Sequence, residues 1–342
     1  MSLLDLFKKE KYTYRCNLLN RHLHFTSRNS LDPCCCINVG PAFISDLKES
    51  TSILSFIKNK KNYIKMFKDG KIPNGCANCT YLEKYSKKEI KEKKFDNNTT
   101  INHITLNHYI SCDCACIYCS QGNRTIDTIK ENYDKKIYDV KNFIKELYEK
   151  ELIDTKSLNV VFQGGNISCL KDHEEILNLF MENGVNKILI FTNNIVYIPL
   201  IEKLLAEGKG EIFTSLDCAS KDLFFKIKQV NKFDQYIDNL KRYIAAAGSK
   251  SITVKYIIIN NVNDNMEEIS KFVDLMLEIG VSRISFDIDY RDIITNTETK
   301  IPEHYKDLVK DIHTLCQSRN IEYAFHDYAE MIVNRGYTMI TR

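Results

Sequence analysis

The sequence predicts an α/β fold in which a partial (β/α)6 barrel follows a small cysteine-rich domain. After residue 100, short apolar runs rich in β-branched residues alternate with longer helical patterns, and the loops between them are short. Ten of the 13 cysteines lie before residue 120, where periodic runs are few. Short strands that alternate with helices form parallel βαβ units. About six such units favour a barrel or partial barrel, with an open doubly wound sheet as the alternative.

Each expected element rests on a local pattern. Apolar runs of strand length predict strands at 102–109, 158–163, 187–192, 211–217, 251–260 and 283–288. Helical periodicity predicts helices at 171–183, 197–207, 232–246 and 265–279, and then a helix near 303–318 and a weak strand at 321–325. The lysine-rich stretch 84–98 is expected to be a linker or a solvated helix.

The 342 residues are enough for about two domains at ~150 residues each. We expect a cysteine-rich domain over 1–95, a barrel over 96–300, and a helix and strand over 301–342 that close the barrel. In parallel α/β folds, ligands bind at the carboxyl ends of the strands. The functional residues are therefore expected at those ends.

Charge and hydropathy exclude several classes of protein. Lysine and arginine number 48 against 45 acidic residues, a net charge of +3, so bulk charge does not indicate a nucleic-acid binder. No apolar run approaches the ~20 residues that span a bilayer. The first residues lack the apolar stretch of a secretory signal. We therefore expect a cytoplasmic protein, whose cysteines bind metal instead of forming disulfides.

The cysteine loop that follows the strand at 102–109 carries the chemistry. Cys112, Cys116 and Cys119 have the spacing C-x3-C-x2-C. A [4Fe–4S] cluster normally takes four cysteine ligands, so three leave one iron open. An open position is typical of a catalytic metal. Cys114, also in this loop, is expected to be a bystander that points away from the cluster.

With Tyr118 in the aromatic position before the last cysteine, this loop resembles that of the radical SAM superfamily, over roughly residues 100–290. Gly164, Gly165 and Asn166 look like the Gly-Gly-Glu motif of that family, which binds the amino group of S-adenosylmethionine (SAM). Asn166 departs from the usual Glu, because an amide accepts a hydrogen bond but supplies no negative charge.

The resemblance implies a fold and a reaction. The fold is the partial TIM-like barrel of the radical SAM type. The cluster on Cys112, Cys116 and Cys119 cleaves SAM reductively to a 5′-deoxyadenosyl radical. That radical abstracts hydrogen from a peptide, sugar or other small-molecule substrate, with net oxidation or rearrangement, as in an oxidoreductase or maturase. A low-potential electron donor such as flavodoxin or ferredoxin is the implied partner.

Further residues at strand ends complete the expected site. The resemblance places cofactor contacts at Tyr118, Gly164, Gly165, Asn166, Asn193, Ser215, Asp217 and Lys255. Asp287, Asp289 and Tyr290, at the end of the sixth strand, are the candidates for catalysis, although an aspartate there is also typical of a turn or cap.

A second cluster is expected in the N-terminal domain. Its ligands would be Cys16, one of the three consecutive cysteines Cys34, Cys35 and Cys36, and the pair Cys76 and Cys79. This order resembles the SPASM or twitch domains of radical SAM enzymes, although it precedes the barrel here. Four thiolates close such a cluster and suit it to electron transfer.

Two other classes stay open at the level of sequence. The cysteine loop and the N-terminal cysteines are each compatible with structural zinc, with Cys114 or His108 as the fourth ligand in the loop. The chain would then be a zinc-binding interaction protein. A non-catalytic iron–sulfur electron carrier or redox sensor is the other alternative, but it would need no open C-x3-C-x2-C loop.

Overall fold

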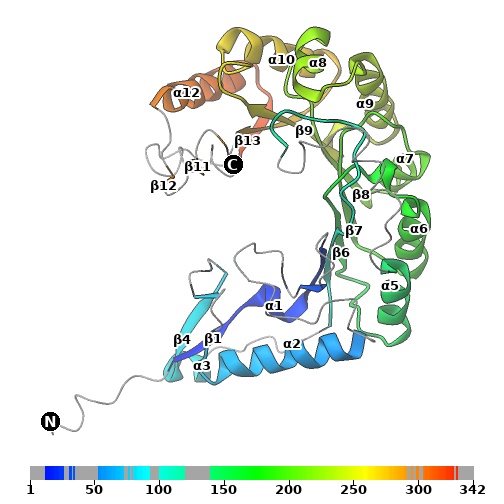
Figure 1. Ribbon diagram of the computed structural model, residues 1–342, viewed down its shortest axis with the longest axis vertical. Coiled ribbons are helices and arrows are strands. Elements are labelled where there is room, and N and C mark those ends of the chain that lie inside the picture. Colours follow the sequence, from blue (N-terminus) through cyan, green and yellow to red (C-terminus); the bar gives the residue numbers. More distant parts are fainter. Residues whose placement is uncertain are drawn as a thin grey trace, which may run out of the picture. The chain divides into compact units, whose positions relative to one another are not determined.

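The computed structural model describes residues 12–26, 31–32, 34, 53–72, 76–77, 79, 81–92, 100–119, 139–289, 291, 294–295, 298–299, 303–326 and 329. Contacts between residues divide the chain into two compact units, whose elements are labelled in Figure 1. The first unit comprises Met1–Tyr109, Lys136–Gly164 and Glu175–Asn186, and the second comprises Ile110–Lys135, Gly165–Glu174 and Lys187–Arg342.

The first unit contains a sheet of four strands. They are β2 (His22–Thr26), β3 (Leu31–Asp32), β5 (His103–Asn107) and β6 (Asn159–Phe162), in the spatial order β3-β2-β5-β6. β2, β5 and β6 are parallel, and β3 runs antiparallel at the edge. Two helices, α5 (Val140–Glu149) and α6 (His173–Asn183), pack on it: Phe25 meets Phe143 of α5 at 6.4 Å between ring centroids.

The rest of the first unit consists of a pair of strands and three helices, of which one is long. The strands β1 (Tyr12–Arg15) and β4 (Glu83–Ser86) pair antiparallel. The helices are α1 (Asn17–Arg21), α2 (Ile53–Lys68) and α3 (Lys87–Glu92). Lys60 of α2 is buried and donates a hydrogen bond to the His22 carbonyl of β2 over 2.7 Å.

The second unit is built on five parallel strands in the order β7-β8-β9-β10-β13. These are β7 (Lys187–Thr192), β8 (Gly210–Ser215), β9 (Ile252–Ile258), β10 (Arg283–Ile288) and β13 (Glu322–Phe325). The α-helices are α7 (Pro199–Ala206), α8 (Lys221–Lys228), α9 (Phe233–Ala247), α10 (Met266–Glu278) and α12 (Glu303–Ser318). Short elements are the 3-10 turns η4 (Ile167–Cys169) and η5 (Ser249–Ser251) and the pair β11 (Ile294–Thr295) and β12 (Glu298–Thr299).

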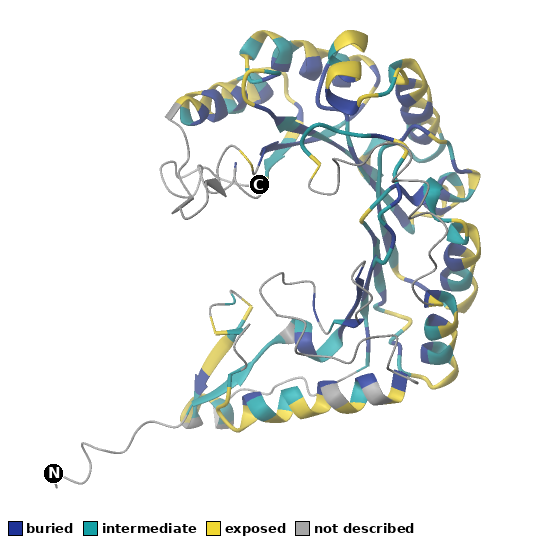
Figure 2. Cartoon of the chain, in the orientation of Figure 1, coloured by how far each residue is buried: buried dark blue, intermediate teal, exposed yellow. Residues whose placement is uncertain are grey.

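Local sequence explains why these helices begin where they do. Ser220 and Asn265 cap α8 and α10, because each side chain accepts a hydrogen bond from the third following amide. Pro199 occupies the first position of α7, where no amide donor is needed. Most strands bury their apolar residues, and in Figure 2 the helices carry many of the exposed positions. Tyr256 of β9, for example, packs against Phe272 and Phe286.

The α/β fold class, a parallel partial barrel of the radical SAM type with a cysteine-rich region before it, is confirmed. The strands expected at 187–192 and 283–288 have those bounds, and the ends of the other expected strands are shifted by at most two residues. Among the described strands β13 pairs only with β10, so this sheet keeps an open edge.

The structure also differs from the expected pattern. β2 lies parallel beside β5, so the strand expected to be first has a neighbour from the cysteine-rich region. The expected set lacks the helices α1, α2, α5 and α8. Part of β4 and the helix α3 cover residues 84–92 of the stretch expected to be a linker or a solvated helix. The domain bounds at 95 and 300 stay a prediction. No helix among the described residues is long and apolar enough to cross a membrane.

Candidate active site

The cysteine loop, residues 110–119, rests on the backbone that follows β6. The Asn166 amide donates a hydrogen bond to the Ser111 carbonyl over 2.8 Å. A Cβ atom on Gly165 would lie 2.0 Å from that carbonyl oxygen, so only glycine allows this approach. Gly164 has φ +119 and, within the first unit, faces the Tyr109 carbonyl. Both glycines therefore shape the backbone at the base of the loop.

Asn166 connects the cysteine loop to the end of β7. Its side chain is 1% exposed. The amide nitrogen donates to Asp113 Oδ1 over 3.0 Å and to the Ser168 hydroxyl over 2.5 Å. Its amide oxygen accepts from Thr192 Oγ1 over 3.0 Å and from the Asn193 backbone over 3.2 Å. Every polar atom of this side chain is therefore used, and its position is fixed.

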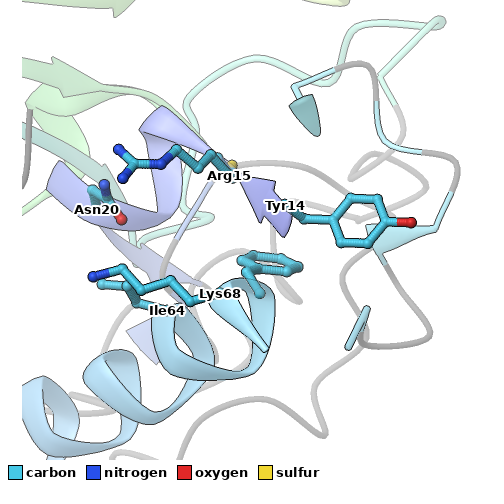
Figure 3. A pocket seen from close by; sticks show the side chains of 7 residues that line it. Tyr14, Arg15, Asn20, Ile64 and Lys68 are labelled. Carbon is cyan, nitrogen blue, oxygen red and sulfur yellow. The ribbon is translucent and has the colours of Figure 1, made fainter. Parts of the chain in front are cut away.

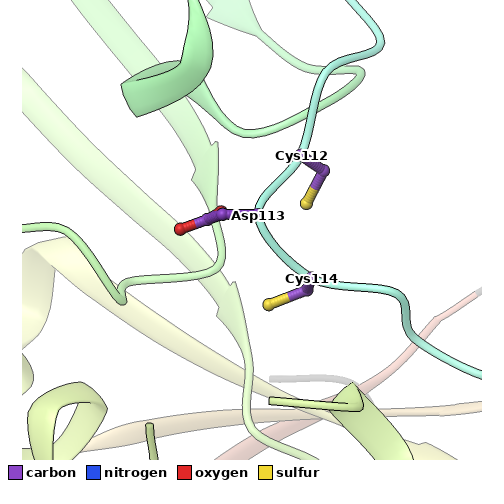
Figure 4. A group of neighbouring side chains, drawn as sticks. All are labelled: Cys112, Asp113 and Cys114. Carbon is purple, nitrogen blue, oxygen red and sulfur yellow. The ribbon is translucent and has the colours of Figure 1, made fainter. Parts of the chain in front are cut away.

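The loop brings Cys112, Asp113 and Cys114 together, as Figure 4 shows. One ligand atom from each lies within 4.8 Å of the other two, and among the residues that the structure describes no other trio of His, Cys, Asp or Glu does so. Asn193 Nδ2 approaches the sulfurs of Cys112 at 3.7 Å and Cys114 at 3.3 Å. The expected trio of Cys112, Cys116 and Cys119 is more widely spaced.

The thiols within the loop differ in pKa. Cys114 is buried, and its thiol is in hydrogen-bond contact with the thiols of Cys112 and Cys116. This hydrogen bond lowers the pKa of Cys112, and with the nearby Lys228 ammonium it lowers the pKa of Cys116 to about 6. The same bonds, and then burial, raise the pKa of Cys114. Cys112 and Cys116 therefore have the character of metal ligands, because the thiolate is the form that binds metal.

Cys119 completes the spacing at the outer end of the loop. Its amide donates to the Cys116 carbonyl over 3.0 Å, a tight turn, and its side chain is exposed. The loop is also tied to the end of α8: the amides of Ala115 and Ile117 donate to the carbonyls of Lys228 and Ile227 over 3.2 and 3.0 Å.

A buried polar cluster of Tyr118, Asp217 and Lys228 stands behind the loop. Asp217 is 0% and Lys228 3% exposed by side chain, and the two form an ion pair. Tyr118 donates to Asp217 over 2.8 Å and lies 2.6 Å from the ammonium. Burial acts to lower the pKa of Lys228, but the Asp217 carboxylate and the Cys116 thiolate outweigh it and raise that pKa. Burial and then Asp217 raise the pKa of Tyr118.

Two residues of this cluster, Tyr118 and Asp217, are expected cofactor contacts. The second Asp217 oxygen accepts from the Ile257 amide over 2.7 Å. Asp217 adopts a left-handed φ of 68, which a non-glycine residue rarely does. Both its side-chain oxygens are therefore engaged inside the protein. Lys228, which the sequence analysis does not single out, lies in a lysine-rich segment that gives no sign of burial.

The remaining expected residues lie on or just after neighbouring strands of the same unit, with Lys255 in the middle of β9. Ser215 and Lys255 are opposite each other in the β8–β9 register. Lys255 forms an ion pair with Asp287 at 2.8 Å. Asp289, 3% exposed, pairs with Arg291, which also donates to the Ile117 carbonyl of the cysteine loop. Tyr290 lies outside the described residues.

The N-terminal cysteines lie within electrostatic reach of one another. Burial, then the neighbouring Cys16 and Cys79, raise the pKa of Cys76 to about 11. Burial lowers the pKa of Lys60 to about 7, against the opposing effect of Cys34 and Cys16. Within the first unit, Cys76 therefore lies near Cys16 and Cys79, and Lys60 lies near Cys34 and Cys16. Cys35 and Cys36 lie outside the described residues.

A small cavity adjoins Cys16. Its lining is Tyr14, Arg15, Cys16, Asn20, Ile64, Phe67 and Lys68, of which Figure 3 labels five. Its volume of about 40 Å³ holds about three waters at ~10–15 Å³ each. It is therefore too small for an organic substrate.

Comparison with known proteins identifies the class. Residues 106–273 match the family model of the radical SAM superfamily. The chain therefore contains a radical SAM domain, and this domain includes the cysteine loop, the two glycines and Asp217.

Individual relatives are more distant. The chain is 24% identical over 245 residues to the GTP 3′,8-cyclase of Clostridium botulinum strain Okra, covering 68% of this chain and 72% of that one. It is 26% identical over 181 residues to a probable GTP 3′,8-cyclase of Saccharolobus islandicus, covering 53% of this chain and 54% of that one.

A solved structure shares the fold. Streptococcus suis SuiB bound to its precursor peptide SuiA superposes with a TM-score of 0.52 at 17% identity, covering 70% of this chain and 53% of SuiB. The chain thus spans about half of the length of SuiB and of the Saccharolobus protein.

Proposed function

We propose that this protein is a radical SAM enzyme in which Cys112, Cys116 and Cys119 hold a [4Fe–4S] cluster with one iron open to SAM. The observation that carries the proposal is the cysteine loop itself. It has three non-equivalent thiols, two of them with lowered pKa, on a backbone anchored by Gly165 and by the end of α8.

The geometry of the loop fits such a cluster. Two thiolates that bind one metal ion lie at most ~4.6 Å apart, because each metal–sulfur bond is ~2.3 Å long. In a cluster each thiolate binds a different iron, so the sulfur atoms of its ligands lie farther apart. Among the described residues, Cys112, Cys116 and Cys119 do not all lie within 4.8 Å of one another. Cys114, whose pKa is raised, lies beside the thiols of Cys112 and Cys116 and is proposed not to bind iron.

The residues around the loop position and shield the reacting groups. When bound, the cluster and SAM supply a 5′-deoxyadenosyl radical that abstracts hydrogen from the substrate. Asn193 donates toward the sulfur of Cys112. Tyr118 belongs to the cysteine loop and bonds to the buried Asp217–Lys228 pair, which holds the loop in place. Gly164, Gly165 and Asn166 are proposed to contact SAM with Ser215 and Lys255, while Asp217 acts from the buried side.

The substrate is proposed to be a peptide, a sugar or another small molecule, with net oxidation or rearrangement. The relatives named above include enzymes that by name act on GTP and one that was solved with a precursor peptide. Asp287 and Asp289 are the acidic groups at the expected substrate end of β10. Because each is paired with a cation, we assign them substrate positioning ahead of proton transfer. A low-potential flavodoxin or ferredoxin would supply electrons in the cytoplasm.

A second cluster is proposed on Cys16, one of Cys34 to Cys36, Cys76 and Cys79. The mutual electrostatic influence of Cys16, Cys76 and Cys79, and the nearness of Cys34 to Lys60, support a shared metal. A SPASM- or twitch-like module at this end of the chain would transfer electrons to or from the substrate.

Anaerobic reconstitution tests the proposal. Iron is counted per chain, and 5′-deoxyadenosine is measured after adding SAM and dithionite. We expect about eight irons per chain for two clusters and formation of 5′-deoxyadenosine. Replacing Cys112, Cys116 and Cys119 by alanine should remove about four irons and abolish cleavage, whereas Cys114→Ala should keep the iron.

The same measurement separates the alternatives. Zinc without iron, and no 5′-deoxyadenosine under any reductant, would sink the proposal in favour of a zinc-binding protein. Iron without SAM cleavage would favour an electron carrier. About four irons with cleavage would keep the enzyme and leave the N-terminal cysteines a structural role.

A further inference from the structure

We infer that Lys60 is the counter-charge of the second cluster: its buried ammonium lies beside the thiols of Cys16 and Cys34 and makes that cluster easier to reduce. Lys60 acts on the cluster through space and is therefore a positioning residue. This inference rests on the second cluster of the proposed function. It follows from the burial, the surroundings and the charge of the Lys60 side chain.

The Lys60 side chain is a cation that the fold shields from water. The residue lies in the middle of α2 and is 2% exposed. Its ammonium donates to the His22 carbonyl over 2.7 Å. That bond fixes the position of the ammonium but supplies no opposite charge. A lysine is almost never buried to this extent unless a negative charge accompanies it.

Two thiols are the groups that can supply this negative charge. Burial lowers the pKa of Lys60, and the groups that act against burial are Cys34 and then Cys16. In the part of the chain that the structure describes, neither an aspartate nor a glutamate forms an ion pair with Lys60. The nearby His22 and His103, whose ring centroids are 4.5 Å apart, are neutral or positive and cannot compensate a cation.

The arrangement of the elements brings α2 and these thiols together. Cys16 is the N-cap of α1, the helix that leads directly into β2. Ile64, one turn after Lys60 on α2, lines the cavity that adjoins Cys16 (Figure 3). Cys34 is buried, and its carbonyl oxygen lies 3.3 Å from Nδ1 of His24 in β2. The ammonium and both thiols therefore belong to one region of the first unit.

A cation in this region changes the free energy of reduction of a cluster there. Four thiolates give a [4Fe–4S] cluster a net negative charge, and its net charge is one of the properties that set its potential. Negative charge near Lys60 also holds the side chain in its ammonium form. Reduction adds one more negative charge, so the ammonium stabilises the reduced form more than the oxidised form. Lys60 thus raises the reduction potential and suits the second cluster to accept electrons.

Redox titrations test this role of Lys60. The background is the full chain with Cys112, Cys116 and Cys119 replaced by alanine, which leaves the second cluster of about four irons. Its midpoint potential is measured anaerobically by electron paramagnetic resonance, without and with Lys60→Met or Lys60→Arg. We expect Lys60→Met to lower the equilibrium constant for reduction at least about ten-fold, a shift of about 59 mV to lower potential. Lys60→Arg, which keeps the charge, should stay near the potential of the background.

A matched control and the metal content separate the inference from the function on which it rests. Lys61→Met, which removes an exposed charge from the same helix, should shift the potential far less. If the soluble background chain holds zinc or no metal, the proposed second cluster fails. If it holds about four irons and Lys60→Met leaves the potential unchanged, Lys60 is not the counter-charge.

A second variant covers the case in which Lys60→Met is insoluble or loses its iron. Lys60→Gln removes the charge and retains a donor for the His22 carbonyl. We expect it to hold the cluster at a lowered potential. An unchanged potential in Lys60→Gln, or a failure to hold iron, would overturn the inference and leave Lys60 a structural role.

Discussion

At the scale of single residues, the site depends on an ion pair that solvent does not reach. Lys228 and Asp217 are 3% and 0% exposed by side chain, and Tyr118 bonds to both. A charge left alone in such a place has no water to stabilise it. Removing one partner of the pair would therefore lower the free energy of unfolding, because the other charge would stay buried and unpaired.

The first prediction concerns this pair. Lys228→Met should lower the free energy of unfolding by about 3–5 kcal/mol, because it leaves the Asp217 carboxylate buried and unpaired. Lys221→Met, which breaks the exposed pair with Asp234, should cost at most about 1 kcal/mol. Anaerobic urea denaturation measures both. Equal effects in the two variants would contradict the assignment, and adding Asp217→Asn to Lys228→Met should recover part of the loss.

A second prediction at this scale concerns pH. Burial lowers the pKa of His108 to about 3, against about 6.5 in an unfolded chain. Between these values the unfolded state binds a proton that the folded state does not, so stability falls as pH drops below about 6.5. At pH 5 the cost is about 2 kcal/mol. His108→Gln should reduce the loss between pH 7 and pH 5 by about this amount in urea denaturation, whereas the exposed His304→Gln should not.

At the scale of elements, sequence periodicity predicts most strands but misses β2. The run 283–288 is apolar enough to be recognised, and it has the predicted bounds. In β2 the polar His22 and His24 interrupt the apolar pattern, yet both are buried. The His22 ring bonds to Thr105, 83 residues away in the sequence, and the His22 carbonyl accepts from Lys60, 38 residues away. Partners so distant in the sequence leave no local signal for this strand.

Contacts between residues distant in the sequence also limit how much of the candidate site the sequence predicts. The spacing of Cys112, Cys116 and Cys119 and the two glycines are visible in the sequence, because ligand spacing and backbone approach are local properties. The sequence predicts a cofactor contact at Asp217. The burial of Asp217 and its bonds to Lys228 and the Ile257 amide depend on residues brought close by the fold, so the sequence does not show them.

The pairing of β2 with β5 predicts the behaviour of a shortened chain. A chain that starts at residue 96 lacks β2, which covers one edge of β5 along five residue pairs. Exposed strand edges recruit other chains, so we expect this fragment to be insoluble or to aggregate. A chain that starts at residue 12 keeps β2 and should behave as the full one does in size-exclusion chromatography. A monomeric, folded fragment from residue 96 would instead support the domain boundary expected near residue 95.

At the scale of the whole molecule, two groups of cysteines lie in different units. Cys112 to Cys119 belong to the second unit, and Cys16, Cys34, Cys76 and Cys79 to the first. Replacing Cys76 and Cys79 together by alanine should therefore lower the iron content from about eight to about four per chain. SAM binding should persist, because the cysteine loop is untouched. Loss of all iron in this variant, seen by colorimetric iron assay, would contradict independent sites.

The hydrogen bonds from Ala115 and Ile117 to the end of α8 also set how the cysteine loop fluctuates. An amide hydrogen exchanges with solvent when its bond opens. These two amides open only when the loop separates from the last turn of the helix, so their exchange reports one shared local unfolding event. We therefore expect the backbone of the cysteine loop to open no more often than the last turn of α8, although residues 110–119 form no regular secondary structure of their own.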